Sequence, residues 1–328
     1  MAKQKNEIEE DIIDDDYEEE IELKIIDYNF EDFSSLYDFL KKYKDNEDAL
    51  KEAIKANIEK IALRYHVNAY SWVFLYDENN SISAHHSNKI YNSIKNLKDM
   101  NKDIAMFLNS PGGSIEPAYL ISKTCKRTSK SKFIVSIPRK AKSAATLISL
   151  GASEIHMGMM SELGPIDPQI GNFPALSMSN ALEKIAETAA KHPAASLMFS
   201  EYLDKNLNLK LLGYFERINE SAIQYAERLL SNSNINSNKS IEEISNHLVN
   251  HYKDHSFVID FEEAKEILGS NMVKEDTNEY LFSNDIYQMF DMINVLLGYL
   301  TRCQLQHFPL EMGTVSLATA EKTKENIM

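Results

Sequence analysis

Cysteine is scarce in this sequence, and long apolar runs are missing. The chain of 328 residues has two cysteines, Cys125 and Cys303, too few for a disulfide framework. Both lie in segments with helical patterning, where we expect small buried apolar residues rather than reactive thiols. No apolar stretch reaches the length of a membrane-spanning helix, and the N-terminus lacks the order of a signal peptide. These absences predict a chain that acts in the cytoplasm, without contact with a membrane.

Positive charge is also in short supply. The chain has 35 Lys and Arg residues against 50 Asp and Glu residues, which gives a formal net charge of −15. Residues 1–20 alone hold ten acidic side chains and two lysines, and such a segment repels itself and buries little apolar surface. We therefore expect residues 1–20 to be a disordered acidic tail, and a candidate binding site for a partner protein. No basic patch in the remainder indicates binding to nucleic acid.

Glycine and proline are absent from residues 28–66, which are rich in Lys and Glu and predict helices. The apolar pattern then alternates between short runs and helical spacing as far as residue 157. The runs predict strands at 70–76, 104–108, 133–137 and 154–157, with helices between them at 90–97, 115–122 and 143–150. This alternation indicates βαβ crossovers and a largely parallel sheet.

Beyond Phe173 the pattern changes to long helices. It predicts helices at 178–202, 207–230, 240–252 and 262–268, one late strand at 257–259, and an apolar helix at 286–300 that packs on the domain or on another subunit. The last 15 or so residues show no periodicity. The resulting division has an acidic tail (1–20), a helical N-terminal extension (21–67), an α/β domain (68–273), and a C-terminal helix and tail (274–328).

Three turns carry residue types that suit acyl transfer, which needs a nucleophile, a base and N–H donors for an oxyanion. In the first, residues 109–114, Gly112 and Gly113 follow a strand and allow backbone N–H groups to point into a cavity. The second places Ser143 after a strand and at the start of a helix. The third, residues 163–168, is an irregular turn. Taken singly, the first segment is also compatible with a plain tight turn, the second with an N-cap serine and the third with a Gly/Pro turn.

In order and spacing, these segments resemble the signal peptide peptidase A group and its cytosolic serine dehydrogenase proteinase relatives, which share the Clp-protease/crotonase superfold. The family's Ser-Pro-Gly-Gly-Ser is matched by Ser110–Ser114. Its Ala-Ala-Ser and the strand that follows are matched by Ala141–Ser143 and Ser153–Ile155, and its Gly-Ser-Ile-Gly turn by Gly164–Asp167. The resemblance implies an α/β, Clp-protease/crotonase-like fold with repeated β-β-α type units and helical N- and C-terminal additions.

The resemblance also implies an activity, that of a cytosolic serine endopeptidase. A protein or peptide substrate would be cleaved through an acyl-enzyme on Ser143, with neither cofactor nor metal. The N–H of Gly112 or Gly113, together with that of Ala144, would form the oxyanion hole. The chain departs from the family pattern at Lys142, where the family has alanine.

The general base is less evident from the sequence. The Clp protease has a histidine about two dozen residues after its serine, and that place here holds Ile166, Asp167 and Pro168. The resemblance to signal peptide peptidase A points instead to a lysine, and Lys210 precedes Arg217 by seven residues as in that family. The alternatives are Lys191, or a triad in which His255 pairs with an acid such as Asp167.

Two other functions are compatible with the same fold. A crotonase-type enzyme would act on acyl-CoA thioesters through the same oxyanion hole, and Asp167 would suit such a site. A scaffold that has lost its base would keep the fold without chemistry. In each case we expect a homo-oligomer, with the helix at 286–300 as a candidate contact.

Overall fold

The computed structural model describes residues 28–78, 81–95, 101–170, 173–233, 235–301, 305–310 and 313–318. The predicted acidic tail, residues 1–20, and Cys303 lie outside these ranges. None of the helices within them is both long and apolar enough to cross a lipid bilayer.

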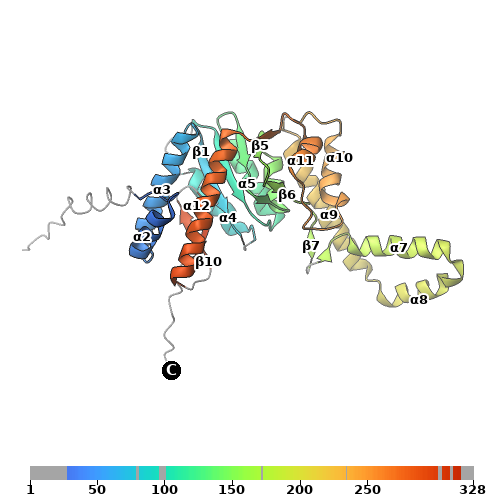
Figure 1. The fold of residues 1–328 in the computed structure, drawn as a ribbon. Helices are drawn as coiled ribbons and strands as arrows, with labels where there is room; N and C mark the ends of the chain where they lie inside the picture. Colours follow the sequence, from blue (N-terminus) through green and yellow to red (C-terminus); the bar gives the residue numbers. More distant parts are fainter. Residues whose placement is uncertain are drawn as a thin grey trace, which may run out of the picture.

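A seven-stranded sheet forms the centre of the molecule, with the strand order β10-β11-β1-β2-β3-β5-β9 (Figure 1). All neighbouring pairs are parallel except β10 and β11. The strands of this sheet are β1 (Ser71–Tyr76), β2 (Ile104–Asn109), β3 (Phe133–Ser136), β5 (Glu154–Met157), β9 (Val273–Glu275), β10 (Leu305–Leu310) and β11 (Gly313–Ala318). Four two-residue strands lie outside it, namely β4 (Lys140–Ala141), β6 (Glu162–Leu163), β7 (Gln169–Ile170) and β8 (Phe173–Pro174).

Helices connect the parallel strands and cover both faces of the sheet. The α-helices of the described residues, including α7 and α8 that do not cover the sheet, are α2 (Phe33–Tyr43), α3 (Glu47–Arg64), α4 (Ala84–Lys95), α5 (Ile115–Thr128), α6 (Ala144–Leu150), α7 (Ser177–Lys191), α8 (Ser196–Asn206), α9 (Leu209–Leu230), α10 (Ile241–Asn246), α11 (Phe261–Leu268) and α12 (Asn278–Thr301). A short 3-10 helix (Pro193–Ala195) precedes α8, and a π-helical segment (His247–His251) follows α10.

Apolar side chains alternate along the central strands and supply two separate cores. In β1, Val73 and Leu75 enter one core, whereas Trp72, Phe74 and Tyr76 enter the other. The first core lies under α4, α5, α6 and α9, and the second lies under α2, α3 and α12 (Figure 1). The four strands predicted from continuous apolar runs are confirmed as β1, β2, β3 and β5. Their sequences are apolar throughout because helices cover both faces of the sheet.

The apolar stripe of α12 is part of the second core. Ile286, Phe290, Ile293 and Leu297 are buried there within the chain itself. The sequence predicted that this helix packs either on its own domain or on another subunit. The structure shows that it packs on its own domain. These four side chains are not available as a contact with a second subunit.

Some predicted elements were wrong. The helix at 178–202 is broken after Lys191, because the proline in His192-Pro193 lacks the N–H that would continue α7. Residues 257–259 contribute a single bridge, between Leu163 and Ile259, rather than a strand of the main sheet. The C-terminal segment 274–328 holds strands β10 and β11 besides its helix and tail, and β11 pairs with β1.

Helices α7 and α8 form an arm that projects away from the sheet (Figure 1). Neither helix has a buried residue, and apolar side chains such as Leu197 and Met198 are 72 % and 61 % exposed. The arm rejoins the body along α9, whose later turns bury Phe215, Ala222 and Ala226. Residues at the tip of the arm are therefore remote from the edge of the sheet.

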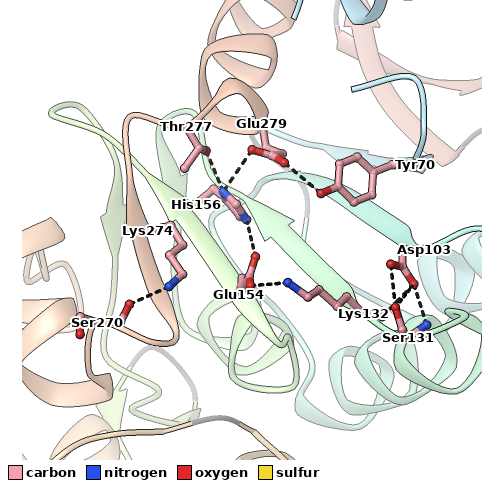
Figure 2. A network of polar contacts seen from close by, with 10 residues as sticks. All are labelled: Tyr70, Asp103, Ser131, Lys132, Glu154, His156, Ser270, Lys274, Thr277 and Glu279. Carbon is pink, nitrogen blue, oxygen red and sulfur yellow. Dashed lines mark hydrogen bonds and ion pairs between the residues drawn. The ribbon is translucent and has the colours of Figure 1, made fainter. Parts of the chain in front are cut away.

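A polar network joins the start of α12 to strand β5 of the sheet (Figure 2). The imidazole of His156, on β5, lies between two carboxylates, with Nε2 3.6 Å from Glu154 Oε2 and Nδ1 3.7 Å from Glu279 Oε2. Lys132 Nζ, from the start of β3, donates to Glu154 Oε1 at 2.8 Å. His156 and Lys132 hold the pKa of Glu154 well below its usual range, at about 2.

This network predicts a pH-dependent contribution to stability from Glu154. A lowered folded-state pKa stabilises the fold above the unfolded-state pKa, and that contribution is lost as the pH falls from about 4.5 towards 2. We expect Glu154→Gln to lower the free energy of unfolding by about 1 kcal/mol at neutral pH, and the difference from wild type to vanish in acid. Chemical denaturation across this pH range measures it, with Glu275→Gln, at an exposed carboxylate on β9, as control. An equal, pH-independent loss would contradict the prediction.

Candidate active site

Ser143 is held at the N-terminus of α6 in a conformation that is rare for a residue with a side chain. Its φ is 51° and its ψ is −115°, and its side chain makes no capping hydrogen bond. The N-cap interpretation of this serine therefore does not account for it. A strained serine between a strand and a helix is the arrangement that exposes a nucleophile, and the surrounding contacts must offset about 1–3 kcal/mol of backbone strain.

The paired glycines lie directly against this serine. A Cβ atom on Gly112 would come within 2.7 Å of Lys142 O and 2.8 Å of Ser143 Cβ. A Cβ atom on Gly113 would collide with the backbone of Ile82, which holds the turn by hydrogen bonds from Ile82 N to Gly112 O and from Ser114 N to Ile82 O. Both glycines have positive φ, 108° and 148°. Glycine is required here for conformation and for close approach.

The backbone donors around Ser143 are not equivalent. Gly112 N donates to Ser110 Oγ at 3.2 Å, so this N–H is occupied. Among the described hydrogen bonds, none uses the N–H of Gly113 or that of Ala144, the first residue of α6. These two N–H groups are therefore the ones that remain for an oxyanion beside Ser143.

Ser143 and the glycine turn open onto a cleft of about 510 Å³. Helix α9 forms part of its wall through Tyr214, Ile218 and Ser221, which share one helical face. The full lining is Ser81, Pro111, Gly112, Gly113, Ser114, Ile115, Glu116, Ser143, Pro168, Gln169, Tyr214, Ile218, Ser221 and His255. The cleft thus joins the nucleophile turn, the glycine turn and a histidine that is remote in sequence.

His255 belongs to a polar cluster at the wall of the cleft. Its Nδ1 lies 3.6 Å from Asp167 Oδ2 and 3.3 Å from Gln169 Nε2. Gln169 Nε2 also donates to Asp167 Oδ2 at 2.6 Å. Asp167 is nearly buried, whereas the side chain of His255 is 35 % exposed on the cleft. A buried carboxylate behind an accessible imidazole is the arrangement that orients a catalytic histidine.

The structure does not bring the two predicted lysines into the cleft. Lys191 is the last residue of α7 and is exposed on the projecting arm. Lys210 is exposed in the first turn of α9, one turn before Tyr214, and is not among the residues that line the cleft. Within the described residues, no cluster of three His, Cys, Asp or Glu side chains is placed to hold a metal ion.

Sequence reasoning missed Gln169 and Ile82. Gln169 bridges Asp167 and His255, and Ile82 contacts the glycine turn through its backbone. A backbone contact leaves no signature in residue type, so no sequence signal could have identified Ile82. The sequence offered His255 as an alternative base, but tertiary packing brings it to Asp167 and to the cleft that Ser143 also lines.

Comparison with known proteins places the chain in a family. Two uncharacterized proteins of Methanocaldococcus jannaschii are similar to it. MJ0137 is 29% identical over 166 residues, 51% of this chain and 52% of that protein, and MJ1495 is 35% identical over 106 residues, 32% of this chain and 36% of that protein. The matches thus span about half of one relative and about a third of the other.

Two solved structures of the membrane-bound stomatin-specific protease 1510-N also match. A serine-to-alanine mutant is 16% identical, with 69% of this chain and 86% of that chain covered and a TM-score of 0.40. A lysine-to-alanine mutant in complex with a substrate peptide is 18% identical, with 69% and 81% covered and a TM-score of 0.40.

The sequence model of the ClpP-like SDH-type serine proteinases matches residues 73–289. This range includes the parallel strands β2, β3, β5 and β9, the nucleophile turn, the glycine turn and His255. The Clp-protease-like α/β fold predicted from the sequence is thereby confirmed. The chain belongs to the family of ClpP-like SDH-type serine proteinases.

Proposed function

We propose that this protein is a serine peptidase that cleaves peptide bonds through an acyl-enzyme on Ser143. The observation that carries the proposal is the strained backbone of Ser143 at the head of α6, facing the Gly112–Gly113 turn in an open cleft. A serine with an ordinary structural role would adopt a relaxed N-cap conformation and use its hydroxyl as a cap.

The base that we propose is His255 rather than Lys210. His255 Nε2 takes the proton of Ser143 Oγ as Oγ bonds to the substrate carbonyl carbon, and the carboxylate of Asp167, 3.6 Å from Nδ1, stabilises the imidazolium that forms. The N–H groups of Gly113 and Ala144 stabilise the oxyanion. The C–N bond then breaks, and the imidazolium returns its proton to the leaving amine. Water hydrolyses the acyl-enzyme with His255 again accepting and returning the proton.

Burial supports this choice of base. A lysine acts as a base at neutral pH when an apolar environment lowers its pKa, and Lys210 is exposed on α9. His255 lies on the wall of the same cleft as Ser143, and histidine is the side chain that most often serves as a general base. In this proposal, Asp167 orients the base, and it occupies the place along the chain where the Clp protease has its histidine.

Covalent labelling of the full chain with a fluorophosphonate tests the proposal. We expect one adduct per chain on Ser143, formed as Oγ displaces fluoride, and none on heat-unfolded protein, because activation requires the folded site. Intact mass and peptide mapping read the result. A folded wild type without an adduct, or with the adduct on another serine, would refute the proposal. Tight binding of coenzyme A without labelling would favour the crotonase-type alternative.

Three further expectations from the sequence stay predictions. They are action in the cytoplasm, assembly into a homo-oligomer, and recruitment of a partner protein by the acidic segment 1–20.

A further inference from the structure

The residue before the nucleophile makes contacts that an ordinary surface lysine does not. Lys142 Nζ lies 2.9 Å from Glu162 Oε2, and it donates to Phe257 O at 3.0 Å and to Ser256 O at 3.4 Å. Its side chain is 13 % exposed, and its stem packs against Gly164, where a Cβ atom would collide with it. Such a largely covered lysine side chain, with three acceptors around its ammonium, is not an ordinary surface contact, since ordering and partly desolvating a lysine is costly.

These contacts join two parts of the site that are far apart in sequence. Glu162 lies on β6, which pairs with β4 immediately before the nucleophile turn. The carbonyl acceptors belong to the loop 253–259, which carries His255. Lys142 therefore spans from the backbone of the nucleophile turn to the backbone of the loop that holds the proposed base.

Apart from the Lys142 contacts, few described contacts tie residues 254–258 to the site. Phe257 and Val258 are 44 % and 52 % exposed, so burial of these apolar side chains contributes little. The bridge between Leu163 and the buried Ile259 fixes the end of the loop, and His255 Nδ1 lies 3.6 Å from Asp167 Oδ2 and 3.3 Å from Gln169 Nε2. Loss of the Lys142 contacts would leave the segment around His255 free to shift.

We propose that Lys142 is a positioning residue. Together with Glu162, it latches the loop 253–259 onto the nucleophile turn and thereby sets the separation of His255 from Ser143. The inference rests on the proposed function, in which His255 is the base. Lys142 does not itself take the proton of Ser143, because its ammonium is directed to Glu162 and to two carbonyl oxygens.

Hydrogen exchange of the full chain tests the latch without reference to activity. We expect Lys142→Met, which keeps the length and apolar stem of the side chain, to speed exchange of amides in 253–259 by about tenfold or more. Lys142→Arg should restore most of the protection. Lys140→Met is the matched control, because Lys140 lies two residues before Lys142, on β4, but pairs with Glu78. If Lys142→Met does not fold, Glu162→Gln tests the same latch from its other side.

Fluorophosphonate kinetics test the catalytic consequence. Lys142→Met should lower the maximal rate of inactivation by about ten- to a hundredfold with an unchanged half-saturating concentration, because the cleft itself is intact. Unchanged exchange in 253–259, or a loosened loop with an unchanged rate of inactivation, overturns the inference. A loosened loop in a protein whose His255→Gln variant labels at the wild-type rate keeps the latch but rejects His255 as base, so the two failures are distinguishable.

Discussion

Ser143→Ala is expected to lower the rate of peptide-bond cleavage by on the order of 10⁶-fold while leaving the fold intact. The substitution removes the atom that forms the acyl-enzyme, and the oxyanion donors alone supply only a residual acceleration. Alanine keeps the Cβ atom that packs near Gly112, and the native side chain makes no capping hydrogen bond that could be lost. Release of fluorescent peptides from labelled casein measures the rate, and circular dichroism confirms the fold.

Ser114→Ala is the matched control for this variant. Ser114 lines the same cleft and is also the N-cap of a helix, α5, without a side-chain capping bond. Its loss should change the rate by less than about threefold, since its hydroxyl has no part in the proposed chemistry. Substantial activity in Ser143→Ala, or an equal loss in both variants, would rule out Ser143 as the nucleophile.

His255→Gln is expected to reduce cleavage almost as strongly as Ser143→Ala, because members of one catalytic triad act as a unit. Glutamine retains a polar side chain of similar reach but has no group that can accept and return a proton at neutral pH. Fluorophosphonate labelling of Ser143 should slow by at least about a thousandfold for the same reason. Cleavage of casein and labelling of Ser143 are measured on the same preparation.

Lys210→Met tests the alternative in which a lysine, and not His255, is the base. Lys210 is exposed and lies outside the cleft, so we expect wild-type rates within about threefold. Near-complete loss of labelling in Lys210→Met, with normal labelling in His255→Gln, would establish a Ser/Lys dyad and reject the histidine. Loss in both variants would require that the first turn of α9 and the loop 253–259 act together, against the present proposal.

Local pattern explains why much of the fold was predictable. The strands β1, β2, β3 and β5 are runs of apolar residues bounded by polar turns, and the helices between them follow from spacing within a few turns. The late strands were not foreseen. Val273–Glu275 is three residues long, and its pairing with β5 depends on a partner strand far back along the chain. Such pairing is decided by what lies beside the strand in space.

The site divides in the same way. Local sequence was enough to predict the nucleophile turn and the glycine turn, because a serine, a pair of glycines and the start of a helix come from residues adjacent along the chain. Tertiary structure alone decided which N–H groups stay open, since Ser110 Oγ occupies that of Gly112. It also singled out His255 as a partner of Asp167 among the alternatives that the sequence left open, because the loop that carries His255 contacts Lys142 and Leu163. Short-range preferences encode turns, whereas the meeting of distant side chains depends on how the packed helices and strands bring their loops together.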